Sequence, residues 1–393
     1  MALKAVKICD NIYWVGAVDW TLRNFHGYTT SRGSTYNAYL IVDETVTLID
    51  TVKANFAGEM LERIASVVDP SKIQVIVSNH VEPDHSGSIP AVLAVAPDAR
   101  VVTVEPQGVR GLTSHYGELN FEPVKAGASL SLGRHTLQFT PTPMVHWPDN
   151  MVTYCPEEKL LFSNDAFGQH YASSGRFDDE EPLGAVFEEA RKYYANIVMP
   201  YGQQTAAALK AVGGLEIGMI CPSHGVIWRQ NIPDIIARYQ AWSANETDGS
   251  AVVVYDSMWH STETMAKTVA ETFREEGIAV KLYDLKVSHH SDIISDILTA
   301  KYIAVGSPTL NNNMLPTVAG FLTYLRGLAP KGRIGFAFGS YGWGGQSIGQ
   351  VEQALDGCGF DKLCESVKIQ YIPRKQSLDE LAQRVRDGIR AGQ

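Results

Sequence analysis

The sequence predicts an α/β protein of two domains, and three observations lead to this prediction. The chain has 393 residues, which is above the usual size of a single domain. The polar stretch 243–250 interrupts the sequence between a helical pattern and a new strand pattern. After it, short apolar strands alternate strictly with helical segments, as in a parallel sheet that helices cover on both faces. We therefore expect a first domain over residues 1–249 and a second over residues 250–393.

The first region mixes strand signals with amphipathic helical patterns. Strands are expected over 38–42, 46–50, 73–78, 100–104, 136–139, 152–155 and 160–163. Helices are expected over 57–68, 186–197, 205–212 and 232–242. Strands grouped in this way and interrupted by helices suggest two sheets with helices outside them.

The second region is more regular. Strands are expected over 251–256, 280–284, 302–306 and 334–339, and helices over 264–276, 293–299, 317–328, 345–356 and 378–390. In an open parallel sheet, ligands bind at the carboxyl ends of the strands. The loops that follow these strands are therefore candidate binding loops.

The composition describes a globular protein with no nucleic-acid or membrane partner. Hydrophobic residues make up 45% and charged residues 19%, and no stretch approaches the ~20 apolar residues that cross a bilayer. The net charge of -10 provides no basic field to gather phosphates. The five cysteines are scattered without a C-x-x-C pair, which argues against a rubredoxin-type centre or an iron–sulfur cluster. Since the N-terminus also lacks a secretory signal, we expect a cytoplasmic protein.

Metal-competent side chains gather at four stations in the first region. The densest station is the segment 80–85, which directly follows the apolar run 73–77. Alternate residues at the end of a strand point the same way, so several of these side chains can converge. The candidate ligands are His80, Glu82, Asp84, His85, His146, Asp165 and His224. This mixed nitrogen and oxygen set is too large for one ion and suits two, and without cysteine it favours non-haem iron, manganese or zinc.

Each of these residues also has an ordinary structural interpretation. A single histidine at a strand end is more often hydrogen-bonded than metal-bound, Asp165 could cap a turn, and His224 could be a loop residue. The cluster at 80–85 is different, because its ionisable groups would repel or stay unpaired in a buried turn unless a cation neutralised the carboxylates. We therefore interpret it as a metal site.

Three strand-end loops of the second region combine hydroxyls, amides, glycines and aromatic rings. Hydroxyls and free N–H groups at a helix N-terminus form an anion site, and aromatic rings beside glycines can stack on a planar ligand. The candidate cofactor-binding residues are Ser257, Met258, Trp259, Ser261, Thr262, Pro308, Thr309, Asn311, Asn312, Ser340, Tyr341, Gly342, Trp343 and Gly344. Any one loop could be ordinary turn chemistry, but all three lie at the expected strand ends. The first turn lacks G-x-G-x-x-G and the P-loop pattern, which disfavours a dinucleotide fold and a P-loop nucleotidase.

These residues carry a resemblance to known families. The second region resembles a flavodoxin-like doubly wound parallel sheet, with 257–262 as the FMN phosphate loop and 307–313 and 340–345 flanking the isoalloxazine, although many flavodoxins place a hydroxyl residue where this chain has Trp259. The first region resembles a metallo-β-lactamase-like αββα sandwich, but most hydrolases of that fold have histidine where this chain has Glu82. That substitution, fused to a flavodoxin-like region, is the pattern of the A-type flavodiiron proteins.

The resemblance implies two non-haem irons and FMN as cofactors. It implies reduction of dioxygen to water, of nitric oxide to nitrous oxide, or both. In this pattern His80, Glu82 and His146 bind one iron, while Asp84, His85 and His224 bind the other. Asp165 bridges the two irons, and not every member of the family uses the position of His85 as a ligand.

The resemblance also implies partners. A rubredoxin-type protein is the expected electron donor, and a separate one, because no rubredoxin-like or reductase-like segment follows in this sequence. A head-to-tail homodimer, or a dimer of such dimers, would bring the flavin of one subunit to the diiron centre of the other.

Further residues could act near the metals. His26, His170 and Tyr194 could donate a hydrogen bond to bound oxygen or line the gas pocket together with Phe25 and Trp147, although core packing is an equal interpretation.

Two other functions stay open at this point. One is a zinc hydrolase with a passenger flavodoxin, against which Glu82 argues. The other is a non-enzymatic electron carrier, against which the complete ligand set argues.

Overall fold

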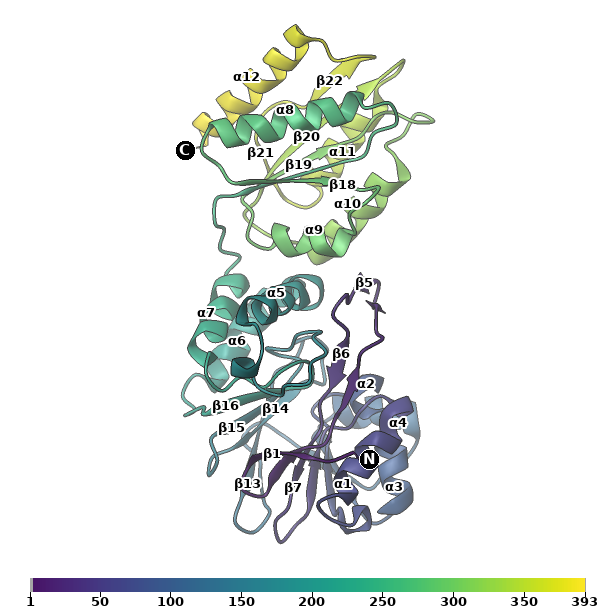
Figure 1. Ribbon diagram of the computed structural model, residues 1–393, viewed down its shortest axis with the longest axis vertical. Coiled ribbons are helices and arrows are strands. Elements are labelled where there is room, and N and C mark those ends of the chain that lie inside the picture. The colour runs from purple at the N-terminus through teal and green to yellow at the C-terminus, as the bar shows by residue number, and fades with distance from the viewer. Residues whose placement is uncertain (1–2, 393) are drawn as a thin grey trace. The chain divides into compact units, whose positions relative to one another are not determined.

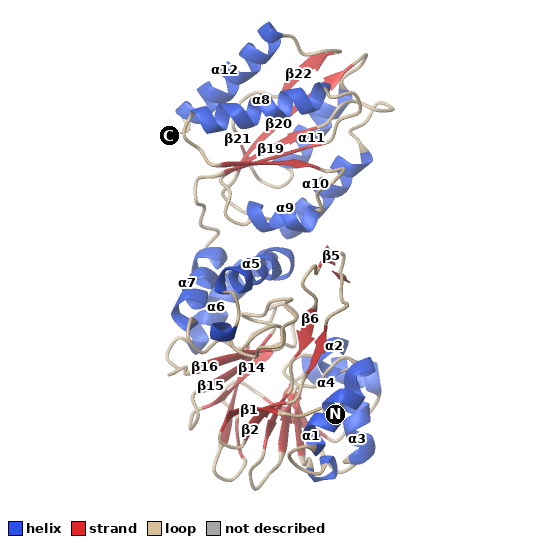
Figure 2. Cartoon of the chain, viewed as in Figure 1, coloured by secondary structure: helices blue, strands red, loops and turns tan. Residues whose placement is uncertain are grey.

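The computed structural model describes residues 3–392 and divides the chain into two compact units (Figures 1 and 2). The first unit comprises the chain up to Tyr194 together with Tyr201–Gln240, and the second comprises Ala195–Pro200 and the chain from Ala241 onward. The domain boundary between residues 249 and 250 stays a prediction. Among the described residues, no helix is both long and apolar enough to cross a membrane.

The first unit contains two mixed sheets that pack face to face. One sheet has the order β1-β2-β7-β8-β9-β10-β11, with bounds Val6–Cys9, Ile12–Trp14, Tyr39–Ile41, Thr47–Ile49, Val75–Val77, Arg100–Val104 and Phe121–Val124. The other has the order β12-β13-β14-β15-β16, with bounds Ser129–Ser131, Thr136–Pro141, Met151–Cys155, Leu160–Asn164 and Met219–Pro222. Two small ribbons pair β3 (Ala17–Asp19) with β6 (Ser34–Tyr36) and β4 (Asn24–Phe25) with β5 (Tyr28–Thr29).

Helices cover both outer faces of this pair of sheets (Figure 2). The seven-stranded sheet is covered by α1 (Ala57–Ala65), α3 (Ile89–Val95) and α4 (Gln107–Tyr116), while α2 (Pro83–Ser86) is a single turn after β9. The five-stranded sheet is covered by α5 (Leu183–Tyr193), α6 (Gly202–Val212) and α7 (Ile232–Ser243). This is the expected αββα sandwich.

Period-two alternation along the strands builds the two cores of this unit. On β8, Ile49 points into the core between the sheets, while Leu48 packs under the helices with Met60 and Ile64. On the facing sheet, Phe139 and Phe162 fill the space between the sheets. Because both faces of each sheet are buried, the strands read as almost continuous apolar runs.

The second unit is a doubly wound parallel sheet, as expected. Its strands have the order β18-β17-β19-β20-β21 with β22 also paired to β20, and their bounds are Val280–Asp284, Ala251–Tyr255, Tyr302–Gly306, Ile334–Tyr341, Asp361–Lys362 and Val367–Gln370. The helices are α8 (Ser261–Glu275), α9 (His290–Ile297), α10 (Pro316–Leu328), α11 (Gln346–Asp356) and α12 (Lys375–Ala391). All strand pairs are parallel, so the loops after the strands meet at one edge of the sheet.

The differences from the predicted elements have physical causes. Strands β1, β2, β11, β12 and β16 were not predicted, because segments of three or four residues show no clear period. Helix α4 was missed because of its glycines: a Cβ at Gly111 would lie 2.9 Å from Val81, and one at Gly108 would lie 2.2 Å from Thr103. The glycines that close packing requires in α4 are therefore the same residues that weakened the helical pattern in the sequence. The segment predicted as a helix over 186–197 is helical throughout, but it is an α-helix (α5) only to Tyr193 and a π-helix over Tyr194–Val198.

Candidate functional site

All the predicted metal-binding side chains meet at one end of the sandwich in the first unit. They lie after β9, within the β13–β14 loop, after β15 and after β16, and each of them is buried. Their ligand atoms form two groups, one of His80, Glu82, His146 and Asp165 and one of Asp84, His85 and His224, with the atoms of each group within 4.8 Å of one another. Asp165 reaches both groups: Oδ2 lies 3.2 Å from Nε2 of His146, and Oδ1 lies 3.0 Å from Nε2 of His85.

Several of these ligand atoms converge without forming hydrogen bonds. Both carboxylate oxygens of Asp84, both of Asp165 and Nε2 of His85 are buried without a hydrogen-bond partner among the described residues. Buried polar atoms of this kind are costly unless a cation binds them. The donor set therefore fits two metal ions, with carboxylate and imidazole ligands that suit iron, manganese or zinc.

The electrostatics of the site favour bound cations. Burial opposes ionisation of Glu82, but the rings of His146, His26 and His80 lower the pKa of this carboxyl below its usual range. Burial also opposes ionisation of Asp165. The rings of His85 and His146 outweigh it and hold the pKa of this carboxyl well below its usual range. Burial would lower the pKa of His85, yet its neighbours Asp84 and Asp165 raise this pKa to about 9. The cluster thus demands positive charge, which metal ions supply in place of ring protons.

Acceptors orient two of the histidine rings. Nδ1 of His80 lies 2.8 Å from Asp149, whose same oxygen accepts the amide of Val81 at 2.7 Å. Nδ1 of His224 lies 2.7 Å from the carbonyl of Thr35. A proton held on Nδ1 leaves Nε2 free to face the metals. Nδ1 of His85 has no such acceptor among the described residues.

A buried carboxylate, Asp50, helps to link three of the four ligand-bearing segments through hydrogen bonds. It lies at the end of β8 in the left-handed region, with φ 54, and accepts the amide of Asn79 at 2.8 Å, Nδ2 of Asn79 at 3.0 Å and Nδ2 of Asn164 at 3.3 Å. Nδ2 of Asn164 also donates to Oγ of Ser223 at 2.9 Å. Each of these three polar residues directly precedes a candidate ligand, namely His80, Asp165 and His224. Sequence reasoning missed this network, because nothing local marks an aspartate as a shared acceptor.

The predicted neighbours of the metals lie at different depths. Nε2 of His26 is 2.5 Å from Glu82, and its side chain is 55% exposed. His170 is fully buried, its ring lies 4.6 Å from that of His224, and burial holds its pKa well below the usual value, so the ring is neutral. The rings of Phe25 and Trp147 lie 4.8 Å from His170 and 5.1 Å from His80 respectively.

The structure places the two adjacent tyrosines differently. The ring of Tyr193 lies 5.2 Å from His170 and 5.9 Å from His224, whereas the ring of Tyr194 packs 5.0 Å from Tyr239. Successive residues of a helix point roughly 100° apart, so only one of the pair can face the metals. Sequence reasoning named Tyr194, and the helical register brings Tyr193 to the site instead.

In the second unit, the predicted cofactor loops gather at the carboxyl edge of the sheet. Ser257 is buried and its hydroxyl has no hydrogen-bond partner among the described residues, just before the N-terminus of the 15-residue helix α8. Oγ1 of Thr262 lies 2.8 Å from Oγ of Ser340, which joins the first loop to the third. An unpaired hydroxyl beside a helix N-terminus fits the phosphate of FMN.

The aromatic residues of these loops are exposed, as a planar cofactor requires. Trp259 and Trp343 are 86% and 81% exposed, which is unusual for residues of this size. Gly344 has φ 94, and Asn311 and Asn312 also have positive φ, so these loops turn sharply around the edge of the sheet. Met258, Pro308, Thr309 and Gly342 lie in the same loops, whereas Tyr341 is the last residue of β20, which extends two residues beyond the predicted strand.

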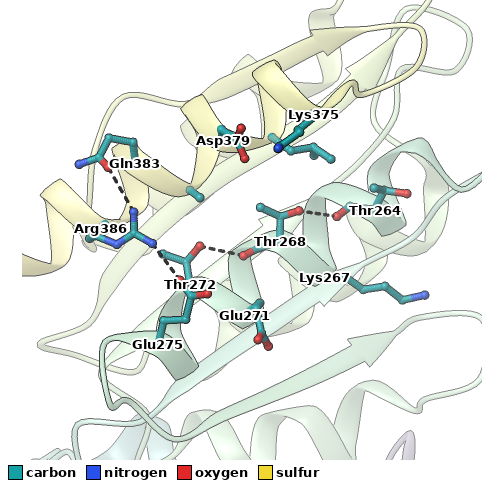
Figure 3. Close-up of a pocket in the computed structure, with 12 residues that line it drawn as sticks. Thr264, Lys267, Thr268, Glu271, Thr272, Glu275, Lys375, Asp379, Gln383 and Arg386 are labelled. Carbon is teal, nitrogen blue, oxygen red and sulfur yellow. Dashed lines mark hydrogen bonds and ion pairs between the residues drawn. The ribbon is translucent and has the colours of Figure 1, made fainter.

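A separate groove of about 840 Å³ lies between α8 and α12 (Figure 3). Its threonine hydroxyls donate to carbonyls of their own helix, and Arg386 pairs with Glu275 at 2.8 Å. None of the buried unpaired polar atoms among the described residues belongs to it. We therefore assign it no ligand.

Known proteins resemble this chain along nearly its whole length. The family model described as ODP family beta lactamase matches residues 35–225, and that of flavodoxin matches residues 253–384. A nitric oxide reductase of Moorella thermoacetica is 45% identical over 95% of each chain. The solved rubredoxin oxygen:oxidoreductase of Desulfovibrio gigas has a TM-score of 0.96 and 44% identity, covering 99% of this chain and 98% of that one. The flavodiiron protein of Giardia intestinalis has a TM-score of 0.96 and 36% identity, covering 99% and 97% respectively.

The Asp50 network predicts a specific loss of metal. In Asp50→Asn one of the acceptor oxygens becomes a donor, so at least one buried N–H loses its partner, at a cost of about 1–3 kcal/mol. We expect a lower free energy of unfolding and fewer metal ions per chain after dialysis against a chelator, measured by urea titration and by elemental analysis.

Asp43→Asn is the matched control for this variant. Asp43 precedes the other end of β8 and accepts the amides of Arg134 and His135 at 3.1 and 2.8 Å, remote from the ligands in the chain. It should lose stability and keep its metal. Equal metal retention by the two variants would contradict the role given to Asp50.

The Ser257 hydroxyl predicts a preference for the phosphorylated flavin. A hydrogen bond to a charged phosphate contributes about 1.5–3 kcal/mol, so Ser257→Ala should weaken FMN binding roughly tenfold or more. Riboflavin, which lacks the phosphate, should bind both proteins equally. Thr264→Ala, an exposed position on α8, the helix that follows Ser257, is the control. Fluorescence titration of the apoprotein gives both dissociation constants. A Ser257→Ala protein that binds FMN normally would remove this residue from the phosphate site.

Proposed function

This chain belongs to the flavodiiron protein family, and from that premise we propose that it reduces dioxygen to water, nitric oxide to nitrous oxide, or both, at a pair of irons supplied with electrons through FMN. The observation that carries the proposal is the ligand set, in which two groups of buried side chains share Asp165. A flavodoxin unit in the same chain provides the electron carrier that a hydrolase does not need.

We assign the ligands residue by residue. His80, Glu82 and His146 would hold one iron, while Asp84, His85 and His224 would hold the other. Asp165 would bridge them, which its two oxygens permit, since each lies close to a ring of a different group. When bound, two irons and one FMN supply four electrons, the number that reduction of one dioxygen to two waters consumes.

The chain itself positions these groups and handles protons. Asp149 and the carbonyl of Thr35 keep the protons of His80 and His224 on Nδ1, which fixes the direction of both rings. His26 lies between solvent and the buried carboxylate of Glu82, so its Nε2 is placed to pass a proton inward. His170, neutral through burial, and Tyr193 enclose the other side and exclude water.

The remaining partners are part of the proposal. A rubredoxin-type protein is the proposed electron donor, because a similar solved protein is named for rubredoxin and this chain has no C-x-x-C pair. All five cysteines are free, which suits a reducing cytoplasm. We further propose a head-to-tail homodimer, alone or as a dimer of dimers, in which the flavin of one subunit serves the metals of the other.

The assigned metal ligands predict that removing one of them abolishes gas consumption and leaves FMN reduction intact. Reduced wild-type enzyme should consume dioxygen, nitric oxide or both at a gas electrode, with about two irons per chain. His146→Ala should lose gas consumption on the order of a hundredfold or more, because a ligand is removed, while its FMN is still reduced by the donor. His115→Ala, an exposed histidine, is the control.

The same experiment separates the proposal from its rivals. Two zinc ions and ester or thioester hydrolysis would identify a hydrolase. Unchanged gas consumption by His146→Ala would remove the assigned ligands from the reaction.

The proposed dimer predicts complementation between two inactive proteins. Ser257→Asp places a negative charge where the flavin phosphate binds and should prevent FMN binding, whereas His146→Ala lacks a metal ligand. Co-expressed with different tags and purified as a mixed dimer, the two should regain part of the wild-type gas consumption. If electrons pass only within one chain, the mixed dimer will stay as inactive as either parent.

A further inference from the structure

A small apolar cavity lies in the first unit, between the five-stranded sheet and helices α6 and α7. Its volume is about 20 Å³. Side chains on the helix-facing side of β14 and β15 form one wall, and α6 forms another. The residues that matter for the argument are Val145, Val152, Leu161, Ala166, Phe167 and Ala208.

The wall of this cavity offers almost no polar surface. The hydroxyl of Thr205 donates to the carbonyl of Tyr201 at 3.0 Å, and that of Tyr239 accepts the amide of Phe167 at 2.8 Å, so both already have a partner. A buried water needs several polar partners, whereas an apolar cavity stays dry and can take up an apolar molecule. The cavity therefore favours an apolar occupant about the size of one water molecule over water itself.

The cavity and the metal centre are built from the same two loop segments. Val145 directly precedes the candidate ligand His146, and Ala166 and Phe167 directly follow Asp165, the proposed bridge. Side chains of adjacent residues in these segments thus serve the cavity wall on one side and the ligand set on the other. The cavity is therefore lined by residues directly adjacent in the chain to two of the proposed metal ligands, His146 and Asp165.

We propose that this cavity is a binding site for the diatomic gas, from which dioxygen or nitric oxide enters the metal centre. The inference rests on the proposed function, whose substrates are both small and nearly apolar. Such molecules leave water for an apolar space, so the cavity raises their concentration beside the metals. No bond forms or breaks there, because the site only holds the gas before the reaction.

Xenon is the first test, since it is apolar, inert and independent of turnover. Crystals of the wild-type holoenzyme pressurised with xenon should show an anomalous peak bounded by Val145, Phe167 and Ala208. Ala208→Leu, which adds bulk inside the cavity, should lose the peak. A wild-type crystal without xenon at this place would overturn the proposal.

Gas kinetics are the second test. The control is Ala207→Leu, the neighbouring exposed residue of α6, which adds the same atoms outside the cavity. When reduced enzyme is mixed with dissolved gas, Ala208→Leu should react roughly tenfold more slowly at low gas concentration, as a small apolar pocket discriminates by about that factor. Its rate at saturating gas should match that of Ala207→Leu. Ala208→Val, which adds less volume, serves if the larger side chain reduces the iron or FMN content.

The outcomes separate the two proposals. If wild-type enzyme consumes neither gas, the proposed function fails, and the gas assignment of the cavity fails with it, whatever xenon shows. If wild-type enzyme consumes gas but the Ala208 and Ala207 variants react alike, the proposed function stands and the cavity is only a packing defect.

Discussion

The balance of buried charge is the constraint on which the metal centre depends. Three carboxylates and four imidazoles lie buried at one end of the sandwich, and several of their atoms have no hydrogen-bond partner among the described residues. Burying such groups costs several kcal/mol each unless opposite charge is close. The histidines lower the pKa of Glu82 and Asp165, so anionic oxygens converge where cations complete the balance. Folding of this end of the sandwich and metal binding are therefore expected to be coupled.

The fold supplies this cluster from loops at one edge of two sheets. The four segments that carry the ligands are far apart in the chain. Hydrogen bonds of Asp50 and Asn164 join the residues that precede three of the ligands. A shared acceptor converts several flexible loop ends into one rigid unit, as positioned ligands require. The same scaffold with histidine at position 82 would suit zinc hydrolysis, and the carboxylate of Glu82 is the local change that favours redox-active iron.

The second unit uses a different physical solution for a different ligand. Parallel strands bring the loops that follow them to one edge of the sheet. There, a helix N-terminus and a serine hydroxyl without a hydrogen-bond partner among the described residues suit an anion, and exposed tryptophans offer flat apolar surface. The first unit concentrates charged side chains in a buried cluster. In the second unit, backbone dipoles at a helix N-terminus are placed to bind the negative charge of a ligand. One chain thereby combines a site that holds metals with one that holds a planar electron carrier.

The sequence by itself determined the chemistry, because residue types and short spacings are local. The sequence shows the cluster at 80–85, the distant candidates His146, Asp165 and His224, the strict strand–helix alternation after residue 250 and the three loops. The two fold classes were predicted from these features. Only the tertiary structure decided which groups meet. The helical register at the end of α5 places Tyr193, and not Tyr194, beside the ligands. Asp50 is a shared hydrogen-bond acceptor, and α4 needs glycine where Val81 packs against it. These outcomes depend on packing between segments distant in the chain, and no local pattern encodes the distance between two side chains that only folding brings together.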